Sequence, residues 1–163
     1  MIIRKFKNGI GSAHKVALKW GYKKKYNRII TMDADGTHNP KYIPKLLKVS
    51  KNADLVITNR FLKKKSIDTW PLFRIMITNI RHLLIKSLLG VPYDASGAYR
   101  CYDPNKIKLR DIIKAEDNSY SFFWESLFIF HQKKYLIKEI SVTLHKRYLG
   151  SSKMTLLDIL KAL

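Results

Sequence analysis

Residues 28–40 read RIITMDADGTHNP, in which a short β-prone run leads directly into two aspartates. Its first part, residues 28–32, predicts a buried strand because it is brief, apolar and rich in β-branched side chains. Asn39 followed by Pro40 is typical of a helix start, and this helix is expected to continue to about Val49. Strand, loop and helix in this order are the unit from which parallel α/β sheets are built.

The rest of the chain continues this alternation of helices and strands. Gly9 and Gly11 predict a tight turn before the first helix, and Gly21 is expected to end that helix. Residues 55–58 (LVIT) predict a second buried strand. Further strands are expected at residues 98–102 and 137–144, and helices at residues 12–20, 71–89 and 122–133, after Asp103-Pro104, and from about Thr155.

The composition is that of one globular domain. The chain has 163 residues, 46% hydrophobic and 27% charged, which excludes a disordered tail or a fibrous repeat. Cys101 is the single cysteine, so an internal disulfide and a cysteine-based zinc cluster are excluded. No apolar run reaches the roughly 18 residues of a transmembrane helix, and no signal peptide opens the chain. We therefore expect a cytoplasmic protein, either soluble or lying on a membrane without crossing it.

The charge balance is strongly basic. Thirty-two basic and 12 acidic residues give a net charge of +20, a field that attracts nucleic acid, anionic membranes or phosphorylated small molecules. Most of the basic residues are lysines, whose clusters are interpreted as solvated surface charge. The eight arginines are more informative, because a planar guanidinium suits phosphate recognition better than an ammonium does.

The predicted helix at residues 71–89 has two distinct stripes. An ordinary helix with its apolar face in the core is the favoured interpretation, and a helix lying on an anionic membrane is the second. Arg81 lies beside the polar stripe. The apolar stripe is Phe73, Met76, Ile77, Ile80, Leu84 and Leu88, and the polar stripe is Arg74, Thr78, His82 and Lys86.

Asp33 and Asp35 are the strongest chemical signal. They follow a strand at the place where open α/β sheets bind ligands, and paired carboxylates there suit Mg²⁺ or Mn²⁺ bound to a diphosphate. Both residues also fit ordinary turn or cap positions. Because acidic residues are scarce in this chain, we favour the metal site.

Seven segments resemble, in order, the motifs of glycosyltransferase family 2, especially its polyprenyl-phosphate (dolichol-phosphate mannose synthase-like) branch. The Asp-x-Asp segment at residues 33–40 is the central one, and the matched segments contain Arg60, Arg74, Arg100 and Arg147. The other six are residues 8–13, residues 53–61, Arg74 with Thr78, residues 94–100 (DASGAYR), residues 122–125 (FFWE) and residues 147–154 (RYLGSSKM).

The resemblance implies an α/β fold of the GT-A type (Rossmann-like), with a mixed, mostly parallel sheet and flanking helices. It implies an inverting, metal-dependent hexosyltransferase that moves a sugar, mannose or glucose, from a nucleoside-diphosphate sugar to a polyprenyl or dolichyl phosphate. Residues 1–163 are then a single partial catalytic domain that lacks the first strand–helix unit and its Pro-x-Tyr-Asn-Glu-like loop. A partner chain that supplies the missing part is one expectation, and an inactive fragment is an alternative.

The resemblance also implies roles for individual residues. Asp33 and Asp35 hold Mg²⁺ or Mn²⁺ and, with Arg60 and Arg74, form the catalytic set; Arg60, Arg74 and Thr78 orient the acceptor phosphate. That phosphate is its own nucleophile, so no general base is needed. The residues assigned to the donor or to loops around it are Asp94, Ser96, Arg100, Glu125, Arg147, Ser152 and Lys153.

Three alternatives stay open at the level of the sequence. Glu125 or Asp94 is the candidate base if the acceptor is a sugar hydroxyl, but we favour Glu125 bonded to backbone or to an arginine. Arg100 is the first of the matched arginines expected to pair with a surface acid instead. His38 is interpreted as a structural hydrogen bonder, and Thr37 departs from the glutamine usual in the branch.

The expected partners follow from the same assignment. They are the nucleotide sugar, the lipid phosphate and an anionic membrane surface, with the protein peripheral at the cytoplasmic face. A basic protein that binds nucleic acid or membrane is the alternative from another class. No nucleic-acid motif is found, and the basic residues are scattered, so nucleic acid is not expected as a partner.

Overall fold

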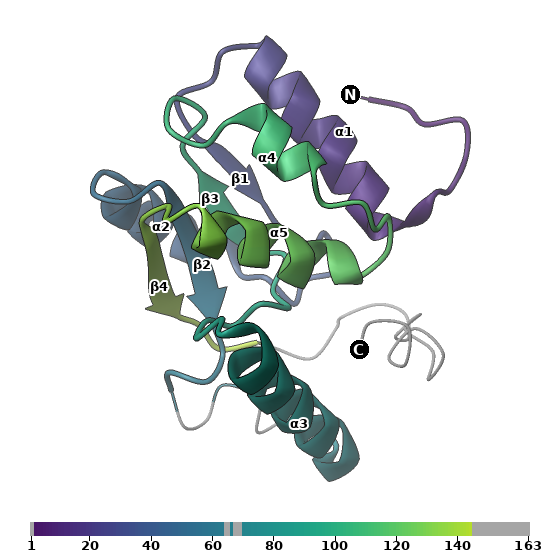
Figure 1. Ribbon diagram of the computed structural model, residues 1–163, viewed down its shortest axis with the longest axis vertical. Helices are drawn as coiled ribbons and strands as arrows, with labels where there is room; N and C mark the ends of the chain where they lie inside the picture. Colours follow the sequence, from purple (N-terminus) through teal and green to yellow (C-terminus); the bar gives the residue numbers. More distant parts are fainter. Residues whose placement is uncertain (1, 64–65, 67–69, 145–163) are drawn as a thin grey trace.

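The computed structural model describes residues 2–63, 66 and 70–144, with the side chain of Arg74 outside this description. Within these residues a four-stranded sheet has the order β1-β3-β2-β4 (Figure 1). β3 is antiparallel to both β1 and β2, whereas β2 and β4 are parallel. Three strands therefore run in one direction and β3 runs against them, which confirms the mixed sheet predicted for the fold class.

Most predicted elements are present, with boundaries that differ by a few residues. The strands are β1 (Ile29–Thr31), β2 (Leu55–Asn59), β3 (Arg100–Tyr102) and β4 (Ile137–Ser141). The helices are α1 (Gly9–Lys23), η1 (Pro40–Tyr42, a 3₁₀ turn), α2 (Ile43–Ser50), α3 (Leu72–Leu89), α4 (Leu109–Ile113) and α5 (Ser121–Gln132).

The sheet lies between two helical layers. Residues of β2 alternate between them: Leu55 and Ile57 pack into the cluster that contains α1, α4 and α5, while Val56 packs into the cluster that contains α2. Figure 1 shows α1, α4 and α5 over one face of the sheet and α2 over the other. All five residues of β2 are buried, as expected of a strand covered on both faces.

Two expectations about glycines were wrong, and both errors come from non-local contacts. α1 does not stop at Gly21 but continues to Lys23. A Cβ atom at Gly21 would lie 2.5 Å from Cδ1 of Ile29, so this glycine lets α1 pack closely on β1. Gly11 belongs to the first turn of α1 rather than to a turn before it, and a Cβ there would lie 2.6 Å from Cβ of Phe122.

The helix expected directly after Asp103-Pro104 was also wrong. The Asp103 carbonyl accepts bonds from the N–H groups of Lys106 and Ile107, and its carboxylate accepts from the N–H of Asn105. These bonds close a turn, and α4 begins only at Leu109. A hydrogen bond from the backbone to a nearby aspartate side chain, as here, competes with helix formation. The helix expected near Thr155 lies outside the described residues.

α3 has the predicted length, but its apolar stripe does not face the core. Phe73, Met76, Ile80 and Leu88 are exposed, whereas Thr78 and Ile85 are buried. The favoured interpretation of this helix as an ordinary core helix was therefore wrong for most of its apolar side chains. Figure 1 shows α3 extending away from the sheet. Among the described residues, no helix combines the length and the apolar character needed to cross a bilayer.

Candidate functional site at one edge of the sheet

The strand register brings the predicted site segments to one edge of the sheet. Thr31 of β1 and Ile57 of β2 both pair with Arg100, the first residue of β3. The carboxyl ends of β1 and β2 therefore flank the start of β3. Because neighbouring strands lie about 4.8 Å apart, the chain leaves β1 and β2 at points about 10 Å apart. Asp33 and Arg60 follow these two strand ends.

The loop after β1 is organised around the two aspartates. The Asp35 carboxylate accepts hydrogen bonds from the Thr37 backbone N–H at 3.1 Å and from the Thr37 hydroxyl at 2.6 Å. Gly36 has φ +82°, a conformation that favours glycine. Thr37 therefore holds Asp35 in place.

His38 is a hydrogen bonder of this loop, as predicted. Its Nδ1 accepts a bond from the Asp33 backbone N–H at 2.9 Å, and its ring lies 5.0 Å from that of Tyr99. Burial lowers the pKa of His38, while the nearby Asp33 raises it and Arg60 lowers it; the net direction is downward. The imidazole is therefore neutral at neutral pH, consistent with an accepting Nδ1. Carboxylates and a guanidinium from different loops thus act on one side chain.

The donor set of Asp33 and Asp35 fits Mg²⁺ or Mn²⁺ held together with a substrate. Both aspartates are partly exposed. Within the described part of the chain, no cluster of three or more His, Cys, Asp or Glu side chains forms an all-protein metal cage. Mg²⁺ is usually bound by one or two carboxylates plus substrate phosphates rather than by such a cage. The two carboxylates are therefore suited to that mode of binding, and metal binding stays a prediction.

The loop after β2 is joined to residues 94–97 by a buried ion pair. Nε of Arg60 donates to Oδ2 of Asp94 at 2.7 Å, and the Arg60 backbone N–H donates to the same oxygen at 3.1 Å. The other carboxylate oxygen of Asp94 accepts from the Ser96 hydroxyl at 3.1 Å. Burial raises the pKa of Asp94, but the charge and hydrogen bonds of Arg60 outweigh it, and the pKa lies below its usual value.

Glu139 on β4 completes this network and was missed by the sequence analysis. Its Oε1 accepts from the Asn59 side-chain amide at 2.9 Å and from the Asp94 backbone N–H at 3.1 Å. Burial raises the pKa of Glu139, although the bonds from Asn59 and Asp94 lower it. An acidic residue within a β-prone run of a chain with only 12 acids was the available signal.

The inner face of α3 lies against the Arg60 loop. The ring of His82 stacks on Phe61 with centroids 4.1 Å apart and planes 18° apart. Thr78 is 9% exposed, and Arg81 is partly buried. The guanidinium of Arg60 lies 5.8 Å from the ring of Trp70, just before α3. The contacts of the Arg74 side chain lie outside the description.

Arg100 does not pair with a surface acid. It is 0% exposed and donates to the carbonyl oxygens of Gly97, Ala95 and Phe123 and to the Ser126 hydroxyl, at 2.7 to 3.1 Å. These contacts tie the 94–97 loop to α5. Arg100 therefore fixes the loop that carries Asp94 and presents no surface to a ligand.

Glu125 is bonded to backbone, the interpretation favoured from the sequence. Its two carboxylate oxygens accept from the N–H groups of Glu116 at 2.8 Å and Asp117 at 3.0 Å. Both oxygens are therefore engaged in holding the loop before α5. The predicted residues Arg147, Ser152 and Lys153 lie outside the described residues.

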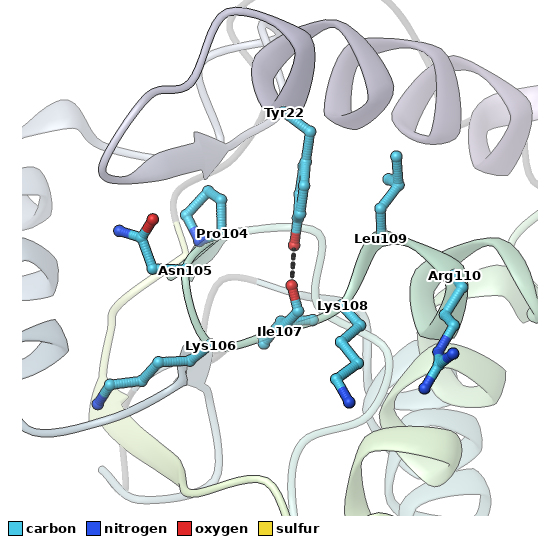
Figure 2. A pocket seen from close by; sticks show the side chains of 8 residues that line it. All are labelled: Tyr22, Pro104, Asn105, Lys106, Ile107, Lys108, Leu109 and Arg110. Atoms are coloured by element: carbon cyan, nitrogen blue, oxygen red, sulfur yellow. Dashed lines mark hydrogen bonds between the residues drawn. The ribbon is translucent and has the colours of Figure 1, made fainter.

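A cavity of about 500 Å³ lies elsewhere, between α1 and residues 104–110 (Figure 2). The Tyr22 hydroxyl crosses to donate to the Ile107 carbonyl at 2.7 Å, and Lys106, Lys108 and Arg110 line the same hollow. Residues 104–110 follow the carboxyl end of β3, which runs against β1 and β2. The cavity is therefore at the opposite edge of the sheet from Asp33 and Arg60.

A mixed sheet between helical layers, with carboxylates after the carboxyl end of β1 and a guanidinium after that of β2, is the arrangement of a GT-A-like α/β domain. The chain belongs to glycosyl transferase family 2: the model of that family matches residues 1–136. The family assignment predicted from the seven motifs is therefore confirmed.

Two curated relatives indicate the branch. The chain is 33% identical over 153 residues to an undecaprenyl-phosphate mannosyltransferase of Micrococcus luteus. The aligned residues make up 93% of this chain and 63% of that protein. The chain is also 29% identical over 162 residues to a polyprenol monophosphomannose synthase of Mycolicibacterium smegmatis, covering 98% of this chain and 61% of that protein. The chain thus matches the polyprenyl-phosphate branch and spans less than two thirds of the length of these relatives.

Proposed function

We propose that this chain forms part of the catalytic domain of an inverting glycosyltransferase. It moves a hexose, mannose or glucose, from a nucleoside-diphosphate sugar to a polyprenyl phosphate at a membrane surface. The observation that carries the proposal is the shared sheet edge, where Asp33 and Asp35 follow β1 and Arg60 follows β2. The names of the two relatives support the acceptor class.

The proposed chemistry needs orientation and charge balance more than proton transfer. A phosphomonoester has a second pKa of about 6, so the acceptor is mostly dianionic near neutral pH and attacks without a general base. The engagement of both Glu125 oxygens by backbone N–H groups agrees with a site that needs no such base. Arg60, Arg74 and Thr78 are proposed to orient the acceptor for attack opposite the leaving diphosphate, which inverts the anomeric centre.

Asp33 and Asp35 are proposed to hold Mg²⁺ or Mn²⁺ beside the donor. A divalent cation there neutralises the charge that develops on the departing diphosphate. Thr37 fixes the Asp35 carboxylate through its hydroxyl, and the neutral His38 fixes the Asp33 backbone. These two contacts keep the carboxylates ordered next to the strand end before the donor arrives.

The proposed membrane contact is made by α3. Six large apolar side chains of this one helix are exposed, and the chain carries a net charge of +20. Such a helix can bury its apolar side in the interface of an anionic membrane while its other side stays with the protein. The exposed residues are Leu72, Phe73, Met76, Ile80, Leu83 and Leu88.

The test is a transfer assay on the full chain. Radiolabelled nucleoside-diphosphate mannose and glucose are incubated with the protein, Mn²⁺ and vesicles that contain a polyprenyl phosphate, and the lipid fraction is counted. Label is expected in the lipid fraction with one of the two donors, and its amount is expected to fall when a chelator replaces Mn²⁺. Absence of label with both donors, from protein shown to be folded, contradicts the proposal.

A further inference from the structure

The inner face of α3 carries a guanidinium that no predicted role uses. Arg81 lies three residues after buried Thr78 and four before buried Ile85, so its position is on the side of the helix that meets the protein. The stacking of neighbouring His82 on Phe61 fixes this side against the Arg60 loop. Arg81 is accordingly partly buried, whereas most arginine side chains are exposed.

Arg81 differs from Arg60 in how its charge is balanced. Among the described residues, Arg60 is paired with Asp94 at 2.7 Å, whereas no carboxylate lies within ion-pair distance of Arg81. Burial lowers the pKa of Arg81, the positive charge of Arg60 lowers it further, and Asp94 raises it. Two guanidiniums therefore lie near the buried Asp94 carboxylate, and of the two only Arg60 is paired with it.

The lack of an ion pair at Arg81 among the described residues is unfavourable in the protein alone. A partly buried cation without a partner loses hydration and gains no ion pair in return. An anion placed beside Arg81 removes this penalty, and it does so more effectively than at Arg60, whose charge Asp94 already offsets. Within the described residues, Arg81 is thus the cation of this loop region best placed to take a new negative charge.

We infer that Arg81 binds the phosphate group of the acceptor, as a binding residue additional to those that the family motifs assign. The inference rests on the proposed function. Positions 74, 78 and 81 are spaced by four and three residues, so Arg81 extends along α3 the face on which the motif positions Arg74 and Thr78 lie. A dianionic phosphomonoester needs more than one positive charge, and a guanidinium donates two parallel hydrogen bonds to it.

The test measures affinity for a short-chain prenyl monophosphate by titration calorimetry on the full chain. R81Q is expected to bind it about 10- to 100-fold more weakly than the unchanged protein, the range for a lost hydrogen bond to a charged group. R81K keeps the charge without the planar fork and is expected to lie between them. R110Q, which changes an exposed arginine at the opposite sheet edge, is the matched control and is expected to bind normally.

Three further ligands separate the sources of the phosphate signal. Inorganic phosphate is expected to lose affinity in R81Q by a similar factor. A nucleoside diphosphate is expected to bind R81Q and the unchanged protein equally, and a loss confined to this ligand overturns the assignment to the acceptor. The prenyl alcohol lacks the charge; if the unchanged protein binds it as tightly as the prenyl phosphate, the proposed acceptor fails, and the inference with it.

Thermal unfolding separates ligand binding from a structural role. Because R81Q removes a partly buried cation that has no ion pair among the described residues, its unfolding midpoint without ligand is expected to equal or exceed that of the unchanged protein. A midpoint lowered in R81Q and restored in R81K indicates a structural role and overturns the inference. Equal affinity of R81Q and the unchanged protein for the prenyl phosphate overturns it too, while leaving the proposed acceptor class intact.

Discussion

Two arginines near the 94–97 loop have opposite surroundings. Arg100, the first residue of β3, is fully buried and donates to three carbonyls and one hydroxyl. Its guanidinium lies 5.4 Å from the ring of Phe123. Arg81, on α3, has no carboxylate partner among the described residues. Both cations lose contact with water, Arg100 fully and Arg81 in part, so the difference lies in whether the protein itself supplies their acceptors.

This difference separates the residues that stabilise the fold from those of the candidate site. On the α5 side, the protein itself supplies the acceptors of the buried Arg100 guanidinium, so a change there is expected to affect folding. The α3 side leaves a charge and an apolar surface without partners among the described residues, so a change there is expected to affect binding more than stability. The following substitutions test this division.

The largest effect is expected from R100M. Methionine removes four hydrogen bonds and leaves buried carbonyl oxygens without donors, so the free energy of unfolding is expected to fall by about 3–5 kcal/mol. Denaturant unfolding followed by circular dichroism measures this change. R110M, at an exposed arginine, is the matched control and is expected to change it by less than about 0.5 kcal/mol. Equal stability of R100M and R110M would contradict the architectural role.

D33N and D35N are expected to reduce the transfer rate next most strongly. Loss of a carboxylate that holds the cation is expected to lower kcat by about 10²–10³-fold, as for other groups that stabilise developing charge. The transfer assay measures this at several Mn²⁺ concentrations. E116Q removes an exposed carboxylate near α5 and is the matched control. Activity of D35N equal to that of E116Q at saturating Mn²⁺ contradicts the metal assignment.

The pH dependence of stability tests the α5 side again, through His14 of α1, whose ring lies 5.0 Å from that of Phe123 on α5. Burial, together with the charge of Arg100, lowers the pKa of His14 to about 4, from 6.5. Below pH 6.5 the unfolded chain takes up a proton that the folded protein does not, so stability falls as the pH drops towards 4. The lost contribution is about 3 kcal/mol at pH 4. H14L removes this group, and its stability is expected to decline less over the same range; parallel declines contradict the assignment.

The sequence predicted what local patterns determine. β1, β2 and β4 follow from short β-prone runs, and α5 follows from an aromatic helical segment. The motifs placed Asp33, Asp35 and Arg60 at strand ends, and the register brings those ends together. These features depend on residues that are close together in the sequence, so a single sequence is enough to predict them.

Features that depend on distant contacts were missed or misjudged. Glu139 acts on Asn59 and Asp94, which precede it by 80 and 45 residues. Gly21 continues a helix because it packs on Ile29. The periodicity of α3 showed that one side is apolar but not whether that side meets the core. Arg81 was noticed beside the polar stripe but was given no role, because no motif contains it, although arginine is scarce in this chain.

The smallest effect is expected at the outer side of α3. Phe73 and Met76 are 62% and 52% exposed, so the double variant F73S/M76S removes apolar surface without opening a cavity. Its free energy of unfolding is expected to change by less than about 0.5 kcal/mol, whereas its affinity for vesicles rich in anionic lipid is expected to fall about tenfold. Cosedimentation with vesicles measures the affinity.

A matched double variant decides whether α3 is special in this respect. L47S/L136S replaces two side chains that are 40% and 52% exposed on other parts of the surface. If α3 lies in the membrane interface, this control keeps its vesicle affinity. Added salt weakens the binding of both variants, because it screens the net charge of +20 that both retain. Equal loss in the two variants would mean that general surface hydrophobicity, rather than α3, drives attachment.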